Sequence, residues 1–359
     1  MSNSIRSVIV ATGSYLPKQV ITSNYFADHQ FFEKDGRRVA KSNPVILDQF
    51  KNITEIEERR YAADDQNTSD LGFLAAKDAL ESSGIDGETL DYIIVAHNFG
   101  DVASGSNRVD LVPTLAARIK QKLQIINPDC VAYDLPFGCP GWVEGMIQAN
   151  YYLKSGDAKR IMVIGAEVLS RITDPHDRDS MIYADGAGAI ILEGIKDSEK
   201  GILSHKTQSH AVDYADLLTM DNSYNPEKSA EKDLYIKMNG RKLYEYALIH
   251  VPQVIKTTLE KASTNLYEIK KVLIHQANGK MDTAIMQRVF KLYGDVEFKP
   301  ELMPMNISHH GNSSVATIPT LLDDILKGKM EGQSINPGDK ILFASVGAGM
   351  NINAIVYQN

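Results

Sequence analysis

The chain has 359 residues, of which 43% are hydrophobic and 23% charged. This length and apolar content suit two domains, or one large double unit with a packed core, and they exclude a disordered protein. The net charge of -8 at pH 7 disfavours nonspecific binding to nucleic acid or to an anionic membrane, so an acidic partner would need a local basic patch.

Two cysteines, Cys130 and Cys139, are too few for a disulfide framework. The segment that begins at residue 129 predicts a strand, and nine residues of extended chain span about 30 Å, far beyond the reach of a disulfide. The N-terminal residues lack the pattern of a signal peptide, and no run of about 18 apolar residues occurs. We therefore expect a protein of the reducing cytoplasm without a membrane span.

Short apolar runs rich in β-forming residues alternate with longer segments of helical periodicity, which predicts an α/β protein. Residues 31–45 form the most polar segment and indicate a loop or an insertion. Thr68 and Ser69 are expected to cap a helix that ends at Gly84. Residues 90–98 (LDYIIVAHN) predict the strand that follows this helix.

The second half of the chain repeats the order of elements in the first half. Residues 244–262 predict a long helix, and residues 270–278 (KKVLIHQAN) predict a strand that corresponds to residues 90–98. Two further pairs keep this order, GCPGWVEGMIQANYYLKSG with GNSSVATIPTLLDDILKGK, and DGAGAIILEG with GMNINAIVYQ. We infer an internal duplication, with halves at residues 1–195 and 196–359 and a site at the interface between them.

Cys139 lies where a buried strand turns into a helix, with Pro140 as the expected first helical residue. Unpaired N–H groups and the helix dipole at such a start favour thiolate over thiol, which suits a nucleophile. The alternative is a small buried hydrophobic residue, the commoner state of an intracellular cysteine. Cys130, at a strand start with no helix behind it, is assigned to that alternative.

Among the nine histidines, His275 is the best candidate partner for a thiolate, because it would lie at the carboxyl end of an apolar strand. His97 holds the corresponding place in the first half and is assigned a structural role. His309 and His310 are adjacent and would point in opposite directions. No metal-binding motif occurs, so no metal site is expected.

Asn312, in HGNSS, precedes a helix expected at residues 315–327 and could simply cap it. Under the duplication, however, Asn312 corresponds to Cys139 of the other half. The two residues would then face each other with His275 alongside. This trio fits several acyl-transfer chemistries.

Several motifs together resemble those of the β-ketoacyl-acyl carrier protein synthase III family of the thiolase-like superfamily. They are CPGW, GAEVLSRITDPHDR, YADGAGAIILE, HQAN and HGNSSVATIP, in this order and at the family's separations. The resemblance extends from residue 13 to the C-terminus. It implies the five-layered α-β-α-β-α thiolase-like fold and a homodimer, in agreement with the duplication.

The resemblance also implies a Cys-His-Asn triad. Cys139 matches the acyl-carrying nucleophile, and His275 and Asn312 match its two partners. The oxyanion hole would consist of backbone amides, those of Cys139, Gly347, Ala348 and Gly349.

Contacts with the coenzyme A or phosphopantetheine part of the substrate are implied for Phe50, Arg178, Asn278 and Lys280. Lys280 also falls where the family often has a basic residue for carrier protein docking. With Arg288 and Lys291 it could form the basic patch that an acidic carrier protein requires.

The implied reaction is an acyl transfer followed by a decarboxylative condensation. Cys139 takes an acyl group from acyl-CoA or acyl carrier protein, and malonyl carrier protein then loses CO2. His275 and Asn312 donate hydrogen bonds to the developing enolate, which attacks the acyl group and gives a β-ketoacyl thioester. Coenzyme A and phosphopantetheine thioesters are substrates, and no metal or redox cofactor is required.

The chain departs from the family pattern at several positions. Phe50 stands where many members have tryptophan, TEI at residues 54–56 replaces TGI, and CPGW replaces C-x-G-[FL]. The insertion at residues 31–45 and the loop at residues 100–110 lie where the family shapes its acyl tunnel and dimer edge. An alternative is therefore a specialised synthase of secondary metabolism, with long or unusual acyl chains and a non-malonyl or ring-forming condensation.

Other classes fit the motifs less well. A degradative thiolase would carry a second cysteine near the C-terminal turn, which here is SVGAGM. A hydroxymethylglutaryl-type synthase would need a glutamate acid, and a plant-like polyketide synthase has another glycine motif. A papain-like hydrolase lacks the duplication. A noncatalytic partner subunit of a synthase remains as a binding-module alternative, although all three triad residues are present.

Overall fold

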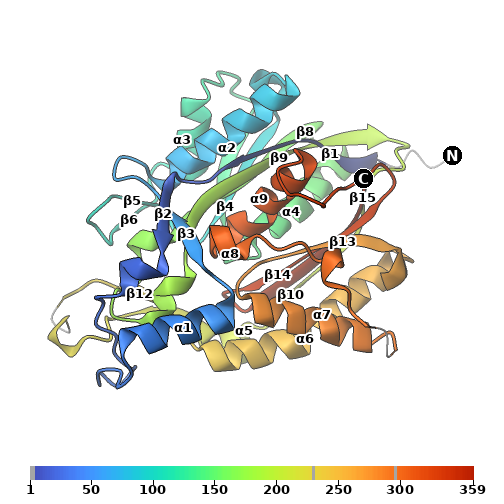
Figure 1. Ribbon diagram of the computed structural model, residues 1–359. Coiled ribbons are helices and arrows are strands. Elements are labelled where there is room, and N and C mark those ends of the chain that lie inside the picture. The colour runs from blue at the N-terminus through green and yellow to red at the C-terminus, as the bar shows by residue number, and fades with distance from the viewer. Residues whose placement is uncertain (1–4, 229–230, 295–296) are drawn as a thin grey trace.

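The computed structural model describes residues 5–228, 231–294 and 297–359 (Figure 1). The first sheet has five strands in the order β1-β9-β8-β4-β7. All five come from the N-terminal part of the chain: β1 (Ile5–Tyr15), β4 (Tyr92–His97), β7 (Val131–Pro136), β8 (Arg160–Val168) and β9 (Asp185–Lys196). The strand expected at residues 90–98 is thus confirmed as β4, two residues shorter at its start.

The second sheet has four strands in the order β10-β15-β14-β13. They come from the C-terminal part of the chain: β10 (Gly201–Ser209), β13 (Ile269–Ile274), β14 (Lys340–Gly347) and β15 (Asn351–Gln358). In each sheet the first two pairs are antiparallel and the third pair is parallel. This correspondence supports the duplication, and we propose the link between β9 and β10 as the boundary of the two halves.

Three layers of helices cover the faces of the two sheets (Figure 1). Helices α2 (Thr68–Ser83) and α3 (Leu115–Lys122) pack on the outer face of the first sheet. Helices α4 (Gly141–Ser155) and α9 (Thr317–Leu326) lie between the sheets, in one core cluster with residues of both. Helices α6 (Gly240–Lys261) and α7 (Gly279–Lys291) cover the second sheet. The five-layered arrangement is therefore confirmed.

Smaller elements surround one end of this body. Helix α1 (Asn43–Thr54) contacts α7, and the short α5 (Ala211–Tyr214) and α8 (Ile307–His310) lie in connections. Three two-stranded ribbons complete the fold: β2 (Gln19–Thr22) with β3 (Glu58–Tyr61), β5 (Asp101–Val102) with β6 (Val109–Asp110), and β11 (Leu218–Asp221) with β12 (Tyr235–Met238). The polar segment 31–45 is irregular until α1 begins at Asn43.

Several helix boundaries differ from the sequence-based expectations. The cap of α2 is Asn67, not Thr68 or Ser69, because its side chain and that of Asp70 form a reciprocal capping box. Gly84 ends this helix in the left-handed conformation, as expected. Helix α6 begins at Gly240, four residues before the expected start, because the side chain of Asn239 caps it.

The two halves are joined by polar contacts as well as by the central helices. Asp323 of α9 is fully buried and accepts hydrogen bonds from Thr12 and Ser14 of β1. A buried carboxylate is stable only with such partners, so these contacts fix α9 against the first sheet. Within the described ranges, no helix is long and apolar enough to cross a membrane.

Candidate active site

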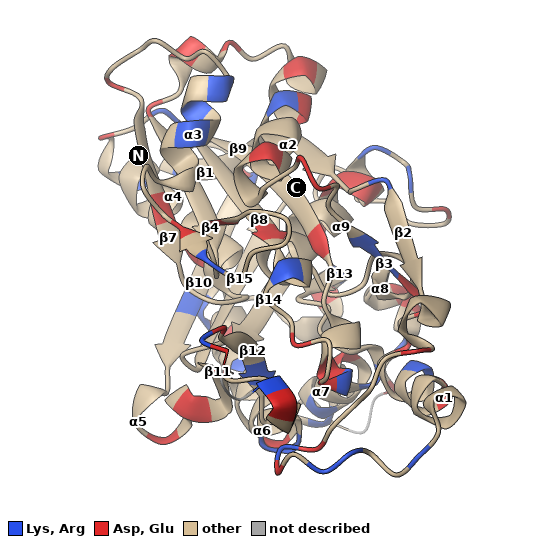
Figure 2. Cartoon of the chain, turned by 90° about the vertical axis from the view of Figure 1, so that its left-hand side faces the viewer, with Lys and Arg blue, Asp and Glu red and all other residues tan. Residues whose placement is uncertain are grey.

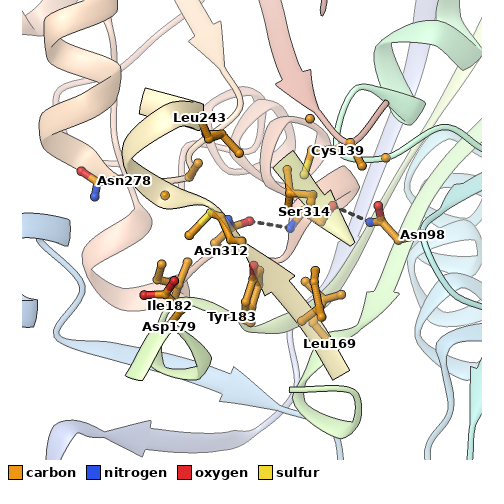
Figure 3. A pocket seen from close by; sticks show the side chains of 18 of the residues that line it. Asn98, Cys139, Leu169, Asp179, Ile182, Tyr183, Leu243, Asn278, Asn312 and Ser314 are labelled. Carbon is orange, nitrogen blue, oxygen red and sulfur yellow. Dashed lines mark hydrogen bonds between the residues drawn. The ribbon is translucent and has the colours of Figure 1, made fainter. Parts of the chain in front are cut away.

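A cavity of about 840 Å³ lies between the two halves, and its walls are mainly apolar. Residues of α1, β7, α6 and α7 and of both ribbon strands β11 and β12 contribute to it. Cys139, His275 and Asn312, which the sequence places in two different halves, all line this cavity. Figure 3 shows Cys139, Asn312 and Ser314 close to one another at its inner side.

Cys139 lies in the short link between β7 and α4. The preceding residue, Gly138, has a φ of 65°, a conformation that glycine adopts without strain. A side chain at Gly138 would also meet the backbone of Ala348, within 3.0 Å. Pro140 is the N-cap residue of α4, and Gly141 is its first residue, so the helix starts one position later than expected. Cys139 therefore lies two residues before the helix.

The expectation that the helix start makes Cys139 a thiolate is wrong for the substrate-free site. Burial raises the pKa of the Cys139 thiol to about 11, and the nearby Glu167 carboxylate raises it too. A hydrogen bond with the Ser314 side chain lowers the pKa, but by less than burial raises it. Cys139 is thus a thiol at neutral pH, because loss of water outweighs the favourable partners.

His275 directly follows β13, and its backbone N–H donates to Ala344 of β14 over 2.9 Å. The ring is buried, and burial lowers the pKa of His275 to about 4. The imidazole is therefore neutral at physiological pH. A neutral imidazole next to a thiol can accept its proton when a substrate arrives.

The hydroxyl of Thr317 pairs with this imidazole and is compatible with either of its neutral tautomers. Nδ1 of His275 is 2.8 Å from Thr317 Oγ1, and Thr317 Oγ1 also donates to the Ser314 carbonyl over 3.0 Å. With the hydroxyl donating to that carbonyl, Nδ1 carries the ring proton and Nε2 is a free base. If the hydroxyl instead donates to Nδ1, the ring proton is on Nε2, which is then a hydrogen-bond donor.

Asn312 is held in place from both sides. Its backbone forms a parallel bridge with Tyr183, with Asn312 N donating to Ile182 and Ala184 N donating to Asn312. Its side-chain Oδ1 accepts from the backbone N–H of Ser314 over 2.8 Å, which leaves Nδ2 as a donor at the cavity wall. Asn312 does not cap α9, which begins at Thr317 after a 3-10 turn, two residues later than expected.

The glycine turn after β14 contacts the nucleophile. A side chain at Gly347 would lie 2.8 Å from the Cys139 backbone nitrogen, so only glycine permits this approach. Within the described residues, no acceptor pairs with the amide N–H of Cys139 or of Ala348. Two free N–H groups at a reacting thiol are the geometry that an oxyanion hole requires.

The expected substrate contacts fall into two groups. Phe50, Arg178 and Asn278 line the cavity, whereas Lys280 is exposed on α7 and is not part of the lining. Arg178 forms an ion pair with Glu33 of the polar segment 31–45, at 3.0 Å. Asn278 caps α7 by accepting from the Met281 backbone N–H, so it has a structural role as well.

Sequence patterns did not indicate four polar residues around the site. Asn98, Ser314 and Asp179 line the cavity, and Glu167 of β8 is buried behind it. Burial and the neighbouring Asp177 raise the pKa of Asp179 to about 7. Asn98 comes after the carboxyl end of β4, and Cys139 comes after that of β7. This position could have marked Asn98 as a candidate site residue. Glu167 lies inside an apolar strand, where only its lone charge is a signal.

Within the described part of the chain, no group of three or more His, Cys, Asp or Glu side chains could hold a metal ion.

Comparisons with known proteins agree with the motifs. Residues 133–211 match the family model described as 3-Oxoacyl-[acyl-carrier-protein (ACP)] synthase III, and residues 259–359 match its C-terminal counterpart. The chain is 32% identical over 344 residues to Beta-ketoacyl-[acyl-carrier-protein] synthase III 1 of Vibrio vulnificus, covering 96% of each chain. It is 32% identical over 362 residues to the synthase III of Prochlorococcus marinus subsp. pastoris, with 99% and 98% of the two chains covered.

The structural likeness extends over the whole fold. The crystal structure of the synthase III from Thermus thermophilus matches with a TM-score of 0.81 at 29% identity, and 98% of each chain is covered.

Proposed function

The chain belongs to the 3-oxoacyl-[acyl-carrier-protein] synthase III family of acyl-transferring condensing enzymes, and from this premise we propose that Cys139, His275 and Asn312 are its catalytic triad. One observation carries the proposal: residues from both halves converge on one apolar cavity that reaches the half-buried thiol of Cys139. The noncatalytic-subunit alternative is not favoured, and no observation singles out a specialised condensation.

In the loading step an acyl thioester enters the cavity. His275 Nε2 takes the proton of the Cys139 thiol, and the sulfur forms a C–S bond with the acyl carbon. The carbonyl oxygen becomes an oxyanion and accepts hydrogen bonds from the free backbone N–H groups of Cys139 and Ala348. Gly347 and Gly349 shape the turn that holds Ala348 in place. The C–S bond to the donor then breaks, and the departing thiolate takes the proton back from His275.

In the condensation step a malonyl thioester replaces the first donor. Its C–C bond to the carboxylate breaks, CO2 leaves, and the electron pair becomes an enolate. Asn312 Nδ2 and the N–H tautomer of His275 donate to the enolate oxygen. The enolate carbon then attacks the acyl carbonyl on Cys139, the C–S bond breaks, and a β-ketoacyl thioester leaves. The Cys139 thiolate then takes a proton from solvent water.

The carrier of these thioesters is an acyl carrier protein in our proposal. Lys280, Arg288 and Lys291 are exposed on α7, whose basic segments are blue in Figure 2, and α7 begins directly after the cavity residue Asn278. Within the described residues, none of the three basic side chains is in an ion pair. An acidic carrier protein can therefore dock on α7 despite the net charge of -8.

The charge at the cavity also bears on the acyl donor of the loading step, and it favours an acyl carrier protein over coenzyme A. Arg178 is the only Lys or Arg among the described lining residues, and Glu33 neutralises it. Coenzyme A carries three phosphates, whereas a phosphopantetheine arm carries one, so coenzyme A loses more from this neutralisation. We therefore infer that Arg178 does not bind coenzyme A strongly while it is paired with Glu33.

Measured condensation rates with acyl-CoA and acyl carrier protein donors test this inference. Glu33→Gln should lower the KM for acyl-CoA by about threefold to tenfold and leave the KM for acyl carrier protein nearly unchanged. Glu57→Gln is a matched control, because Glu57 pairs with Lys51 outside the cavity lining. If Glu33→Gln changed the KM for both donors equally, a role of Glu33 in donor choice would be contradicted. If the unmodified chain formed no β-keto product with any donor, the proposed function itself would be contradicted.

We propose a homodimer formed through β7. This strand is an edge of the first sheet, and its Val131 side chain is exposed, so it offers unpaired backbone groups and apolar area to a second copy. Sedimentation equilibrium at micromolar concentration should give twice the chain mass of 39.7 kDa. A monomer at all concentrations up to 100 µM, roughly the range of stable dimers, would rule the proposal out.

The location that we propose is the cytoplasm. Cys130 and Cys139 are both free, and Cys130 is buried in the core around the first sheet, as expected from its position. Free thiols persist in a reducing compartment, where carrier protein substrates would be met.

A further inference from the structure

Glu167, the penultimate residue of β8, is fully buried behind the candidate nucleophile. Its carboxylate accepts three hydrogen bonds, from the backbone N–H groups of Asn98 and Phe99 and from Asn98 Nδ2. Burial raises the pKa of Glu167 to about 7, while these donors hold it down. A buried carboxylate with three donors, beside a reactive thiol, is costly to retain unless its partners use it.

Asn98 connects this carboxylate to the cavity. Its Nδ2 also donates to Ser314 Oγ over 2.7 Å, as the dashed line in Figure 3 shows. Two backbone N–H groups donate to Glu167, and above a pH of about 7 its ionised carboxylate only accepts, so the amide atom that faces it is the nitrogen. The same nitrogen then donates to Ser314, whose oxygen acts as the acceptor.

Ser314 therefore has its own hydroxyl proton available for another acceptor. Its backbone has a φ of 52°, and its N–H is held by Asn312 Oδ1, which fixes the residue in the cavity wall. Ser314 and Cys139 line the same cavity and lie near each other in Figure 3, and the Ser314 side chain lowers the pKa of the Cys139 thiol. A hydroxyl that donates a hydrogen bond to sulfur stabilises the thiolate. The effect is stronger when the hydroxyl proton has no other acceptor to which it can donate.

We propose that Glu167, Asn98 and Ser314 form a buried chain of hydrogen bonds that directs the Ser314 proton to the Cys139 sulfur and so sets the acidity of the thiol. Ser314 is a catalytic residue in this chain, and Asn98 and Glu167 are positioning residues that act through it. The inference rests on the proposed function, in which Cys139 must become a thiolate in the loading step and leave as one in the condensation step.

The two ends of the chain have opposite effects on the sulfur. The Ser314 hydroxyl favours the thiolate, whereas the negative Glu167 repels it. Other titratable groups also face these residues, namely His275 of the proposed triad, Tyr183 next to Cys139, and His97, which lies beside Glu167 with Nε2 3.2 Å from Asp134. Substitutions at the two ends should therefore change the thiol acidity in opposite directions.

Alkylation of Cys139 by iodoacetamide, followed by peptide mass analysis between pH 6 and 9, measures this acidity without any substrate. Ser314→Gly removes the hydroxyl and suits the positive φ, so it adds no backbone strain. We expect alkylation about threefold to tenfold slower at each pH, because one charge-assisted hydrogen bond is lost. Ser313→Ala is the matched control, since it removes a neighbouring hydroxyl that forms no hydrogen bond with any residue that the structure describes.

Glu167→Gln keeps an acceptor for the Asn98 donors but removes the charge, so alkylation should become about threefold faster. The rate should also rise more steeply with pH between 6 and 8 than in the unmodified protein. In the unmodified protein, Glu167 becomes negatively charged as the pH rises past about 7, and this charge opposes formation of the Cys139 thiolate. Asn98→Leu should slow alkylation as Ser314→Gly does, because the hydroxyl is then released.

The proposal is overturned if Ser314→Gly alkylates at the unmodified rate, or if Ser314→Gly and Glu167→Gln change the rate in the same direction. A merely structural role predicts the second result, since both variants would loosen the site alike. Failure of the proposed function gives a different pattern: Cys139 would not load any acyl thioester, while the alkylation rates of the variants would still move in opposite directions.

Discussion

Cys139→Ala should not acquire an acyl group from any thioester, and its condensation rate should fall by at least about 10³-fold. The reason is that the sulfur forms the bond that holds the acyl group between the two steps. Intact-mass analysis after incubation with a panel of acyl thioesters measures the loading directly. The same panel shows which chain lengths the apolar cavity accepts, since only those add their mass to the protein.

Cys130→Ala is the matched control for this experiment. Cys130 is buried in the core around the first sheet and is not part of the cavity lining. The Cys130 residue is only 1% exposed, so a thioester cannot reach its sulfur. The Cys130→Ala variant should load acyl groups as the unmodified chain does, and an adduct on Cys130 would contradict the assignment of Cys139.

His275→Ala and Asn312→Ala should each lower malonyl decarboxylation by about 10² to 10³-fold, because each removes one donor to the enolate oxygen. Asn312→Ala should still load acyl groups on Cys139, since Asn312 takes no part in deprotonation of the thiol. Loading should be slower in His275→Ala, which lacks the base. The release of CO2 from a malonyl thioester and the mass of the loaded protein separate these two effects.

The pH dependence of decarboxylation tests the state of His275. Because burial lowers the pKa of His275 to about 4, the ring stays neutral when the pH falls from 8 to about 5.5. An imidazole at its ordinary pKa of about 6.5 would gain a proton within this range. The pKa of Glu167 and that of Asp179 are about 7, so the profile is measured in Glu167→Gln and Asp179→Asn, where the rate should change little. An inflection near 6.5 that persists in both variants would contradict a buried neutral His275.

His309→Ala is the matched control for His275→Ala, since His309 is exposed and lies outside the cavity lining. Its decarboxylation rate should equal that of the unmodified chain. If His275→Ala or Asn312→Ala also decarboxylated at the normal rate, the role of that residue in enolate stabilisation would be wrong.

Much of the fold follows from patterns that are local in the sequence. The strand at residues 92–97 and the helix that ends at Gly84 were predictable because hydrophobic periodicity and a left-handed glycine act over a few residues. The caps at Asn67 and Asn239 were not, since Thr, Ser and Asn are all good caps and the choice depends on which side chain reaches a free N–H. Helix α4 begins at Gly141 instead of Pro140, and no side-chain hydrogen bond caps it.

The sequence also placed the three triad candidates in one site, because the duplicated order of elements requires strand ends of the two halves to meet. The roles that the motifs imply for Lys280 and Arg178 depend instead on surroundings. Lys280 is near the cavity in sequence but outside its lining, and Arg178 lines it but pairs with Glu33, 145 residues away. No local pattern reveals such a pairing.

By itself, the sequence determined the α/β class and the internal duplication, because these depend on composition, order and spacing. Its motifs, through their resemblance to a known family, implied the five-layered fold and the residues that meet at the cavity. Only the tertiary structure decided their chemical state. Cys139 is a thiol and His275 a neutral base because burial removes water from both, and Glu167, Asn98 and Ser314 join behind the sulfur from three distant segments. Desolvation and hydrogen bonds between distant segments arise from packing, which periodicity and motifs do not describe.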